Sequence, residues 1–221
     1  MYIVIEGNIG AGKTTLLKEL SKIYSYPIIE EPVQKWVSGP ENLLAKYYED
    51  PKQYCSRFQH RVLDTIRVDI CEPNTVVERS PYSTYHVFIH LARMKGHLSG
   101  DEYAKLTDKY VHTIRTQIPM KAIIYLKTSP KIAMQRVKAR GRPEERNLKL
   151  ETIVELDRQH DLIFAKNRHL FNVPVYTLDA ELPLHKLVPE VDQILRLTHD
   201  VDRNTPFVSI RDGLTDQIQY N

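Results

Sequence analysis

The hydrophobic residues of this chain gather in five short runs that are rich in β-branched side chains. The runs read YIVIE at 2–6, PIIEE at 27–31, TVVER at 75–79, KAIIYLKT at 121–128 and VPVYTLD at 173–179. Apolar and polar positions alternate little within each run, which is typical of strands that are buried on both faces. Because the intervals between the runs are long enough for helices, the pattern predicts an α/β fold with a parallel sheet covered on both sides.

Helical periodicity fills the intervals between these runs. An amphipathic helix is expected to open at 15–20, two helices broken near Lys95-Gly96 are expected over 83–118, and 144–171 indicates one helix or a helix pair. A further helix is expected to carry the apolar stripe of Phe58, Val62, Ile66 and Ile70. That helix is also expected to hold both cysteines, Cys55 and Cys71, roughly 24 Å apart and too far for a disulfide.

The composition limits the class of protein. The 221 residues contain no visible linker or repeat, so we expect one domain over 1–198 and a tail over 199–221 whose role the sequence does not give. The net charge of +3 is too small and too evenly spread to indicate a nucleic-acid partner. No stretch approaches the roughly 18 apolar residues of a membrane span. With the first run beginning at residue 2 and reduced cysteines, we expect a cytoplasmic protein, although a viral or trimmed organellar chain would look the same.

The first run leads directly into the string GNIGAGKTT at 7–15, which fits the pattern G-x-x-x-x-G-K-[ST] of a phosphate-binding loop. In such a loop the backbone N–H groups surround a polyphosphate, the lysine reaches the β- and γ-phosphates, and the hydroxyl binds Mg²⁺. The strand before it and the helix after it are the context that the pattern requires. The sequence therefore predicts a nucleoside triphosphate site formed by Gly7, Asn8, Ile9, Gly10, Ala11, Gly12, Lys13, Thr14 and Thr15.

Charged residues stand where two other predicted strands end. Glu31 is followed by Pro32, which fixes a turn, and Glu78 is followed by Arg79. Because the carboxyl ends of parallel strands share one edge of the sheet, these residues are expected near the phosphate loop. There a carboxylate could accept a proton, an arginine could stabilise a transferring phosphoryl group, and a second acid could help to hold Mg²⁺. Taken alone, each is also compatible with an ordinary surface position.

Two further segments carry candidate chemistry. Arg136 and Arg140 lie one helical turn apart and Arg142 follows in a turn, which suits an arginine-rich lid over phosphates, although most charge runs are simply solvated. Gln59 lies beside an apolar stripe, where its amide could either bond neighbouring backbone or read the edge of a base.

His86 and His90 are four residues apart on a predicted helix, as two zinc ligands could be. The sequence offers no third ligand nearby, so we interpret them as ordinary helix residues.

With these segments in place, the chain resembles the deoxynucleoside kinases, the family that includes deoxycytidine kinase, mitochondrial thymidine kinase and the broad-specificity insect enzyme. The resemblance runs in order to about residue 185. It rests on GNIGAGKTT at 7–15, EPVQKW at 31–36, YYEDPKQYCSRFQ at 47–59, ERSPYS at 78–83, RVKARGRPEE at 136–145 and VPVYTLDAEL at 173–182. It implies a P-loop NTPase-like, three-layer α/β/α fold with a five-stranded parallel sheet and an Arg-rich lid, in a homodimer.

The resemblance also implies roles for individual residues. Glu31 would take the proton from the nucleoside 5′-hydroxyl, with Arg79 and Lys13 as its catalytic partners, and Thr14 and Glu78 would bind the Mg²⁺ that accompanies ATP. Tyr48 and Glu145 would bind the 3′-hydroxyl, and Gln59 would read the base. Trp36, Phe58 and Phe88 would form the apolar walls, with Val62, Ile66 and Thr84 beside them. Arg136, Arg140 and Arg142 would be lid cations on the ATP side.

The preferred base follows from what surrounds Gln59. An amide can pair with either thymine or cytosine, so neighbouring groups must choose. Deoxycytidine-preferring relatives place an arginine and an aspartate nearby, whereas the matching positions here are Ile66 and Thr84. Without that charged pair, the pocket is expected to have room for the thymine methyl group. We therefore expect thymidine to be favoured and deoxycytidine to be accepted as well.

Other readings of the sequence stay open. A thymidylate kinase would share the loop and the sheet but would need extra cations for the phosphate of its acceptor. A non-catalytic family member serving as a structural subunit would keep the fold, yet Lys13, Thr14, Glu31 and Arg79 are all present. A switch GTPase is a further option, but no N-K-x-D guanine motif occurs.

Overall fold

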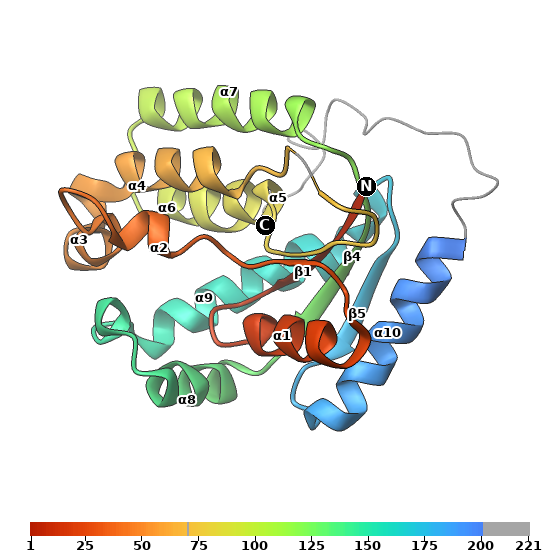
Figure 1. The fold of residues 1–221 in the computed structure, drawn as a ribbon. Helices are drawn as coiled ribbons and strands as arrows, with labels where there is room; N and C mark the ends of the chain where they lie inside the picture. Colours follow the sequence, from red (N-terminus) through yellow and green to blue (C-terminus); the bar gives the residue numbers. More distant parts are fainter. Residues whose placement is uncertain (70, 201–221) are drawn as a thin grey trace.

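A five-stranded parallel sheet forms the centre of the computed structural model, which describes residues 1–69 and 71–200 (Figure 1). The strand order is β2-β3-β1-β4-β5. Every neighbouring pair is parallel, and the first strand lies in the middle. The strands are β1 (Tyr2–Gly7), β2 (Ile28–Ile29), β3 (Val76–Glu78), β4 (Met120–Lys127) and β5 (Val175–Asp179). The predicted three-layer α/β fold and its five strands are confirmed.

Residues on both faces of β1 are buried, which explains the lack of alternation in its sequence. Tyr2 and Val4 point into one core, whereas Ile3 and Ile5 point into the other, and each is at most 1% exposed. A parallel strand covered by helices on both sides has no face for polar residues. The run YIVIE is therefore apolar up to its last residue, Glu6, which is also buried.

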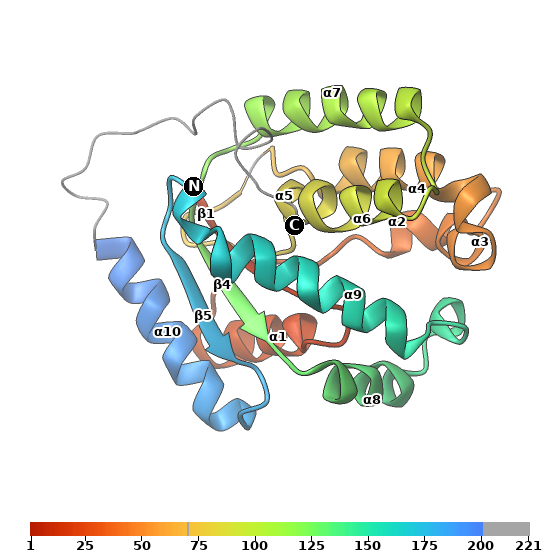
Figure 2. The same ribbon diagram turned by 180° about the vertical axis from the view of Figure 1, so that it is seen from behind.

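The first core lies between the sheet and two helices, α1 (Lys13–Tyr24) and α10 (Leu184–Asp200), which cover the same face (Figure 1, Figure 2). Leu16, Leu17 and Leu20 of α1 are fully buried against it. Spacings of three and four residues place these side chains on one side of the helix. Because α1 begins where the phosphate loop ends, this packing also fixes the position of the loop.

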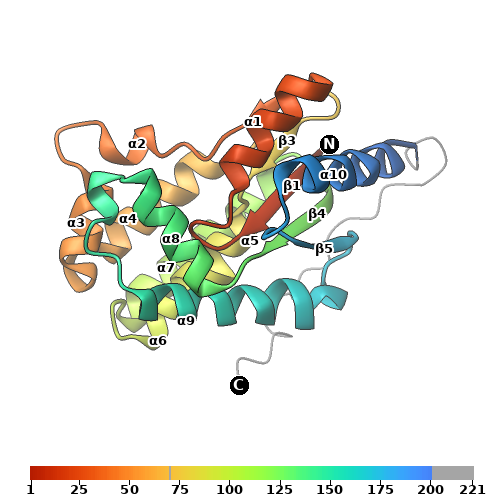
Figure 3. The same cartoon turned by 90° about the horizontal axis from the view of Figure 1, so that it is seen from below.

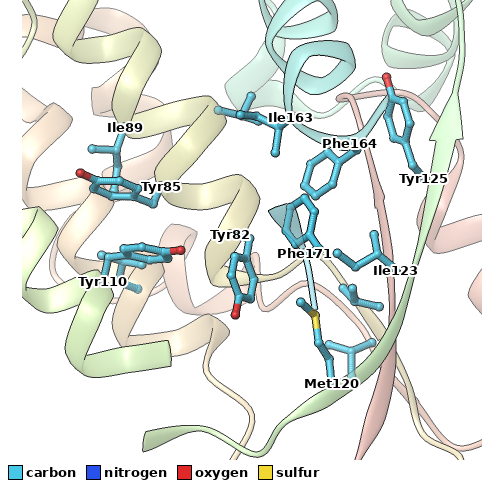
Figure 4. Packing of buried hydrophobic residues seen from close by; sticks show 14 of the residues in the cluster. Tyr82, Tyr85, Ile89, Tyr110, Met120, Ile123, Tyr125, Ile163, Phe164 and Phe171 are labelled. Atoms are coloured by element: carbon cyan, nitrogen blue, oxygen red, sulfur yellow. The ribbon is translucent and has the colours of Figure 1, made fainter. Parts of the chain in front are cut away.

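The second core lies on the opposite face and is larger and richer in aromatic rings. It is covered by α4 (Pro51–Ile66), α5 (Pro81–Ser83), η1 (Thr84–Ile89), α6 (His90–Met94), α7 (Gly100–Thr116), α9 (Leu150–His160) and η3 (Asp161–Lys166). The short η4 (Arg168–Leu170) follows η3. Tyr85 stacks on Tyr110 with ring centroids 4.3 Å apart, and Phe164 stacks on Phe171 at 5.6 Å (Figure 4). Such ring pairs add to the stabilisation from burial. The predicted break near Lys95-Gly96 separates α6 from α7 and is confirmed.

Shorter elements gather beyond the carboxyl ends of the strands. These are α2 (Gln34–Val37), α3 (Leu43–Glu49), α8 (Pro130–Arg140) and η2 (Pro143–Glu145). Seen from below, α8 runs close to the connection between β1 and α1 (Figure 3). The helix ends at Gly141, whose φ of 66° is the left-handed conformation that glycine adopts most readily, and the turn leads directly into η2. The predicted lid segment is therefore a helix followed by a tight turn.

One predicted helix is shorter than the sequence indicates. Cys55 lies in α4, but α4 ends at Ile66, so Cys71 lies in the connection that follows, and the single helix expected to hold both cysteines is wrong. The reason is a tertiary contact: Val68 is buried and its carbonyl accepts a hydrogen bond from the Ile118 N–H, which draws the chain away from the helix axis. Both cysteines are free thiols. Ile70 and most of the predicted tail lie outside the described residues.

In residues 1–69 and 71–200, no helix has both the length and the apolar character that crossing a bilayer requires. The same residues contain no group of three or more His, Cys, Asp or Glu side chains that could together hold a metal ion.

Candidate active site

A cavity of about 430 Å³ opens at the carboxyl ends of β1, β2 and β3. This is the edge at which a doubly wound sheet binds its ligands. Its wall contains most of the residues that the sequence singles out. They are Ile9, Gly10, Lys13, Thr14, Glu31, Trp36, Tyr48, Phe58, Gln59, Val62, Glu78, Arg79, Thr84, Phe88, Arg140, Arg142 and Glu145.

The glycines of the phosphate loop are required by its backbone. Gly7, Gly10 and Gly12 have φ values of 150°, 80° and 95°. A Cβ atom on Gly10 would lie 2.3 Å from the carbonyl oxygen of Ala133 in α8, far inside van der Waals contact. Only a residue without a side chain allows the loop to pass so close to α8. Asn8 fixes the same region, because its side-chain amide donates to the Ile153 carbonyl over 2.9 Å.

Lys13 is buried at the base of the loop. Its ammonium group donates to the carbonyl oxygens of Gly7, at 3.1 Å, and Asn8, at 3.0 Å. Burial and the nearby charge of Arg79 lower the pKa of Lys13 to about 8, against the opposing effect of Glu78 and Glu31. The lysine is therefore a cation held in a position where it is poorly solvated, and a polyphosphate would compensate for the lost hydration.

Thr14 and Glu78 form a pair of oxygen ligands beside Lys13. The Thr14 hydroxyl lies 2.9 Å from both carboxylate oxygens of Glu78, and one of those oxygens also accepts the Glu31 backbone N–H at 3.4 Å. Hydroxyl and carboxylate oxygens are hard donors of the kind that Mg²⁺ prefers, and Mg²⁺ commonly takes only one or two protein ligands, with phosphates and water completing the set. The two side chains fit a Mg²⁺ site.

Glu31 and Arg79 form an ion pair in the cavity wall. The Arg79 Nε–H donates to a carboxylate oxygen of Glu31, and the two side chains are 17% exposed for Glu31 and 4% exposed for Arg79. Burial alone would favour the neutral acid, but the charges of Arg79 and Lys13 and the hydrogen bond from Arg79 outweigh it and lower the pKa of Glu31. Glu31 is therefore a carboxylate that stays ionised although it is largely shielded from solvent.

Arg79 has an unusual backbone. Its φ of 65° is in the left-handed region, where a side chain costs roughly 1–3 kcal/mol. The turn at Arg79 carries the chain from β3 into α5, and the guanidinium lies over the Phe88 ring, 4.7 Å from its centroid. The Nη1 atom is buried and has no hydrogen-bond partner among the described residues. Strain of this kind concentrates at functional sites.

The lid segment contributes a second charged cluster. Arg140 and Arg142 donate to the two carboxylate oxygens of the buried Glu145, over 2.6 and 2.8 Å. Arg136 is placed differently: it donates to the backbone carbonyls of Ala11, at 3.1 Å, and Ala180, at 2.9 Å. Arg136 therefore holds the outer side of the phosphate loop, whereas Arg140 and Arg142 line the cavity.

The remaining wall is aromatic. The Phe58 ring stacks on Tyr47 at a centroid distance of 4.8 Å and meets the edge of Trp36 at 5.7 Å. Trp36 is fixed in turn by a 2.8 Å hydrogen bond from its indole N–H to the Thr65 hydroxyl. Gln59 is 2% exposed and lines the same cavity as these rings. This half of the cavity suits a flat, polar-edged ring.

Some residues expected at the site lie outside the cavity wall, and some residues of the wall were not expected there. Ile66 packs in the apolar cluster with Phe58 and Val62 but is not part of the cavity wall. Gly7, Asn8, Ala11, Gly12 and Thr15 of the phosphate loop are also outside the cavity lining, as is Arg136. Tyr47, Leu44 and Val33 line the cavity and were not singled out in the sequence. Tyr47 stands next to Tyr48 in the stretch YYEDPKQYCSRFQ, and this position was the one feature of the sequence that could have indicated its place in the cavity wall.

Comparisons with known proteins agree with this geometry. The pattern of the deoxynucleoside kinase family matches residues 3–203. A probable deoxycytidine kinase of fowlpox virus is 32% identical over 192 residues, which cover 81% of this chain and 78% of the relative. Human mitochondrial thymidine kinase 2 is 28% identical over 200 residues, covering 86% of this chain and 75% of the relative.

Among solved structures, a deoxyadenosine kinase from M. mycoides with the products dCMP and dCDP superposes with a TM-score of 0.76. It is 26% identical, and the match covers 89% of this chain and 99% of that kinase. The chain belongs to the deoxynucleoside kinase family. It is accordingly a kinase, and the family fold accounts for the sheet order and the phosphate loop. The family assignment also favours nucleoside over nucleotide phosphorylation, against the thymidylate kinase alternative.

The close approach of the loop to α8 gives a first prediction for this kinase. Gly10→Ala should weaken ATP binding by roughly tenfold or more, because the new Cβ would displace Ala133 and the positive φ would be strained. Isothermal titration calorimetry measures the affinity. Gly100→Ala is the matched control, since a Cβ there meets nothing within 4 Å. Equal affinities in the two variants would contradict the argument.

The low pKa of Lys13 gives a second prediction. Below about pH 8 the lysine of the free enzyme carries its charge, and above it the charge is lost. Since a triphosphate binds the ammonium form, the dissociation constant for ATP should rise roughly tenfold from pH 7 to pH 9, with uptake of close to one proton on binding at the higher pH. Calorimetry in buffers of different ionisation enthalpy measures both quantities. An affinity that is constant over this range, with no proton uptake, would refute the prediction.

Proposed function

We propose that this kinase transfers the γ-phosphoryl group of ATP, with Mg²⁺, to the 5′-hydroxyl of a deoxynucleoside, favouring thymidine and also accepting deoxycytidine. One observation carries the proposal. The largely buried Glu31–Arg79 ion pair lies beside the Thr14–Glu78 pair in a single cavity that also contains the aromatic wall around Phe58. A phosphoryl donor and a nucleoside acceptor would therefore meet at these charges.

Glu31 is the proposed base. A group that is ionised and shielded from bulk water can accept the proton of a bound alcohol as the oxygen attacks phosphorus. Arg79 holds the carboxylate through its Nε, while its Nη1 remains available for a phosphoryl oxygen. Phosphoryl transfer depends mainly on positioning and on stabilising charge, and this pair supplies both.

The acceptor sugar is assigned to Tyr48 and Glu145. Both line the cavity, and burial together with the charge of Glu145 raises the pKa of Tyr48, so its phenol stays protonated. A phenol donor and a carboxylate acceptor side by side suit a hydroxyl such as the 3′-hydroxyl of deoxyribose. Arg140 and Arg142, which fix Glu145, would link the sugar site to the phosphates and help exclude water.

The base is assigned to the space between Gln59 and the aromatic wall. Relatives are named for different deoxynucleosides, so the family alone does not choose the base. Thymidine is favoured because Ile66 and Thr84 stand at the positions where deoxycytidine-preferring relatives carry an arginine and an aspartate. Ile66 packs with Phe58 and Val62 outside the cavity lining, so the direct contact with a base would come from Thr84. Thr84 lines the cavity and its hydroxyl is bonded to the Ser80 carbonyl at 3.1 Å, which leaves its methyl group for an apolar contact.

Residues 1–198 would form a single kinase domain, and the family resemblance suggests that two chains form a homodimer. We assign no role to residues 199–221. When bound, Mg²⁺ would neutralise charge on the donor phosphates through Thr14 and Glu78, while Lys13 would contact the β- and γ-phosphates.

The role of Glu31 is tested by Glu31→Gln. The amide keeps the shape of the side chain but cannot accept the proton, so kcat should fall by roughly 10²–10⁴-fold while the KM for ATP changes little. Turnover is measured with labelled ATP and thymidine. Glu19→Gln, an isosteric change on the partly exposed side of α1, is the control and should behave as the unchanged enzyme. A kcat for Glu31→Gln within threefold of the unchanged enzyme would exclude Glu31 as the base.

Base preference is tested with thymidine, deoxycytidine, deoxyadenosine and deoxyguanosine as acceptors. We expect the highest kcat/KM for thymidine, then deoxycytidine, and values at least roughly tenfold lower for both purines. A purine preference would refute the assignment. Including dTMP separates the remaining alternative, because turnover of dTMP without turnover of thymidine would indicate a thymidylate kinase.

A further inference from the structure

A buried carboxyl group on β1 has no place in the chemistry described so far. Glu6 is 0% exposed and precedes the phosphate loop in the central strand. It is not part of the cavity wall. Burying such a group costs free energy, because an ionisable side chain loses its hydration. Its contacts point to the segment that follows Arg79.

One oxygen of Glu6 holds the start of α5. Its Oε1 accepts hydrogen bonds from the Ser80 hydroxyl, at 2.5 Å, and the Ser83 hydroxyl, at 3.0 Å. The backbone of the preceding residue makes a third link, since the Ile5 carbonyl accepts the Arg79 N–H at 3.0 Å. Ile5 and Glu6, which are adjacent in β1, therefore hydrogen-bond to the chain at Arg79 and just after it.

The two sides of α5 are held by different contacts. Tyr82, the middle residue of α5, packs edge-on against Tyr110 and Phe171 and anchors the far side of α5 in the core (Figure 4). The start of α5, next to the strained backbone of Arg79, is held by the hydrogen bonds from the Ser80 and Ser83 hydroxyls to Glu6. A residue held in a sparsely populated conformation persists only when its surroundings impose it.

We propose that Glu6 is a positioning residue: through Ser80 and Ser83 it imposes the left-handed turn that aims the Arg79 guanidinium at Glu31 and the transferring phosphoryl group. The inference rests on the proposed catalytic role of Arg79. Burial raises the pKa of Glu6, against the opposing charge of Arg79 and the two serine hydrogen bonds. The contacts to Ser80 and Ser83 use only the acceptor oxygen Oε1, and an amide oxygen can accept the same two hydrogen bonds. Glu6→Gln should therefore keep the turn in place.

The matching variants separate positioning from simple damage. Glu6→Leu removes the acceptor at similar volume, Glu6→Gln keeps it, and Ser83→Ala removes one donor. We expect kcat to fall roughly 10–100-fold in Glu6→Leu and roughly three- to tenfold in Ser83→Ala, with the KM for ATP nearly unchanged, and Glu6→Gln to stay within threefold of the unchanged enzyme. Thr75→Val, a buried hydroxyl at the opposite end of β3, is the control and should leave kcat unchanged.

Dependence on Arg79 is the decisive readout. In an Arg79→Ala background, Glu6→Leu and Ser83→Ala should lower the residual kcat by less than threefold, because the side chain that they position is gone. Equal losses in both backgrounds would overturn the inference, as would a Glu6→Gln variant as impaired as Glu6→Leu. If Glu6→Leu does not fold, Ser83→Ala in the two backgrounds tests the same dependence. If Arg79→Ala itself leaves kcat unchanged, the proposed function is what fails.

Discussion

The ion pair between Glu31 and Arg79 is the constraint around which the site is arranged. A buried ion pair contributes little to stability, since the cost of removing two charges from water offsets their attraction. This ion pair also requires a strained, left-handed backbone at Arg79. The folded sheet compensates for both effects, because it brings the ends of β2 and β3 together beside the phosphate loop of β1. An unfavourable arrangement held in this way indicates a role in chemistry rather than in folding.

The cavity has two halves that meet at this pair. On one side are a cation and a hydroxyl–carboxylate pair, Lys13, Thr14 and Glu78, which suit a nucleotide phosphate and Mg²⁺. On the other are stacked rings around Phe58 and the amide of Gln59, which suit a nucleobase. The lid cluster of Arg140, Arg142 and Glu145 borders both. A ligand in either half would therefore act on the same few charges.

The sequence predicts best what is local. The phosphate loop is encoded in nine consecutive residues, and the strand ends are marked by Glu31 and by Glu78-Arg79, so the fold and most of the cavity wall could be expected from the chain alone. Side-chain and backbone contacts between separate elements are harder to predict. The stacking of Tyr47 on Phe58 joins α3 to α4, and the end of α4 depends on a hydrogen bond between Val68 and Ile118.

Glu6 shows the same limit more clearly. In the sequence it is one polar residue at the end of an apolar strand, and nothing beside it signals a function. Its partners, Ser80 and Ser83, are more than seventy positions away. Arg136 is a comparable case, since its helical spacing with Arg140 suggests a lid cation, whereas its guanidinium binds the backbone of Ala11 and Ala180. Side-chain direction is set by packing, which periodicity does not specify.

The central claim is that Glu31 receives the proton of the nucleoside 5′-hydroxyl. A crystal structure with thymidine and a non-hydrolysable ATP analogue tests it most directly. We predict a Glu31 carboxylate oxygen within about 2.6–3.2 Å of the 5′-oxygen, with Arg79 still bonded to the same carboxylate. A complex in which thymidine occupies the cavity while Glu31 turns to solvent, away from the 5′-oxygen, would contradict it.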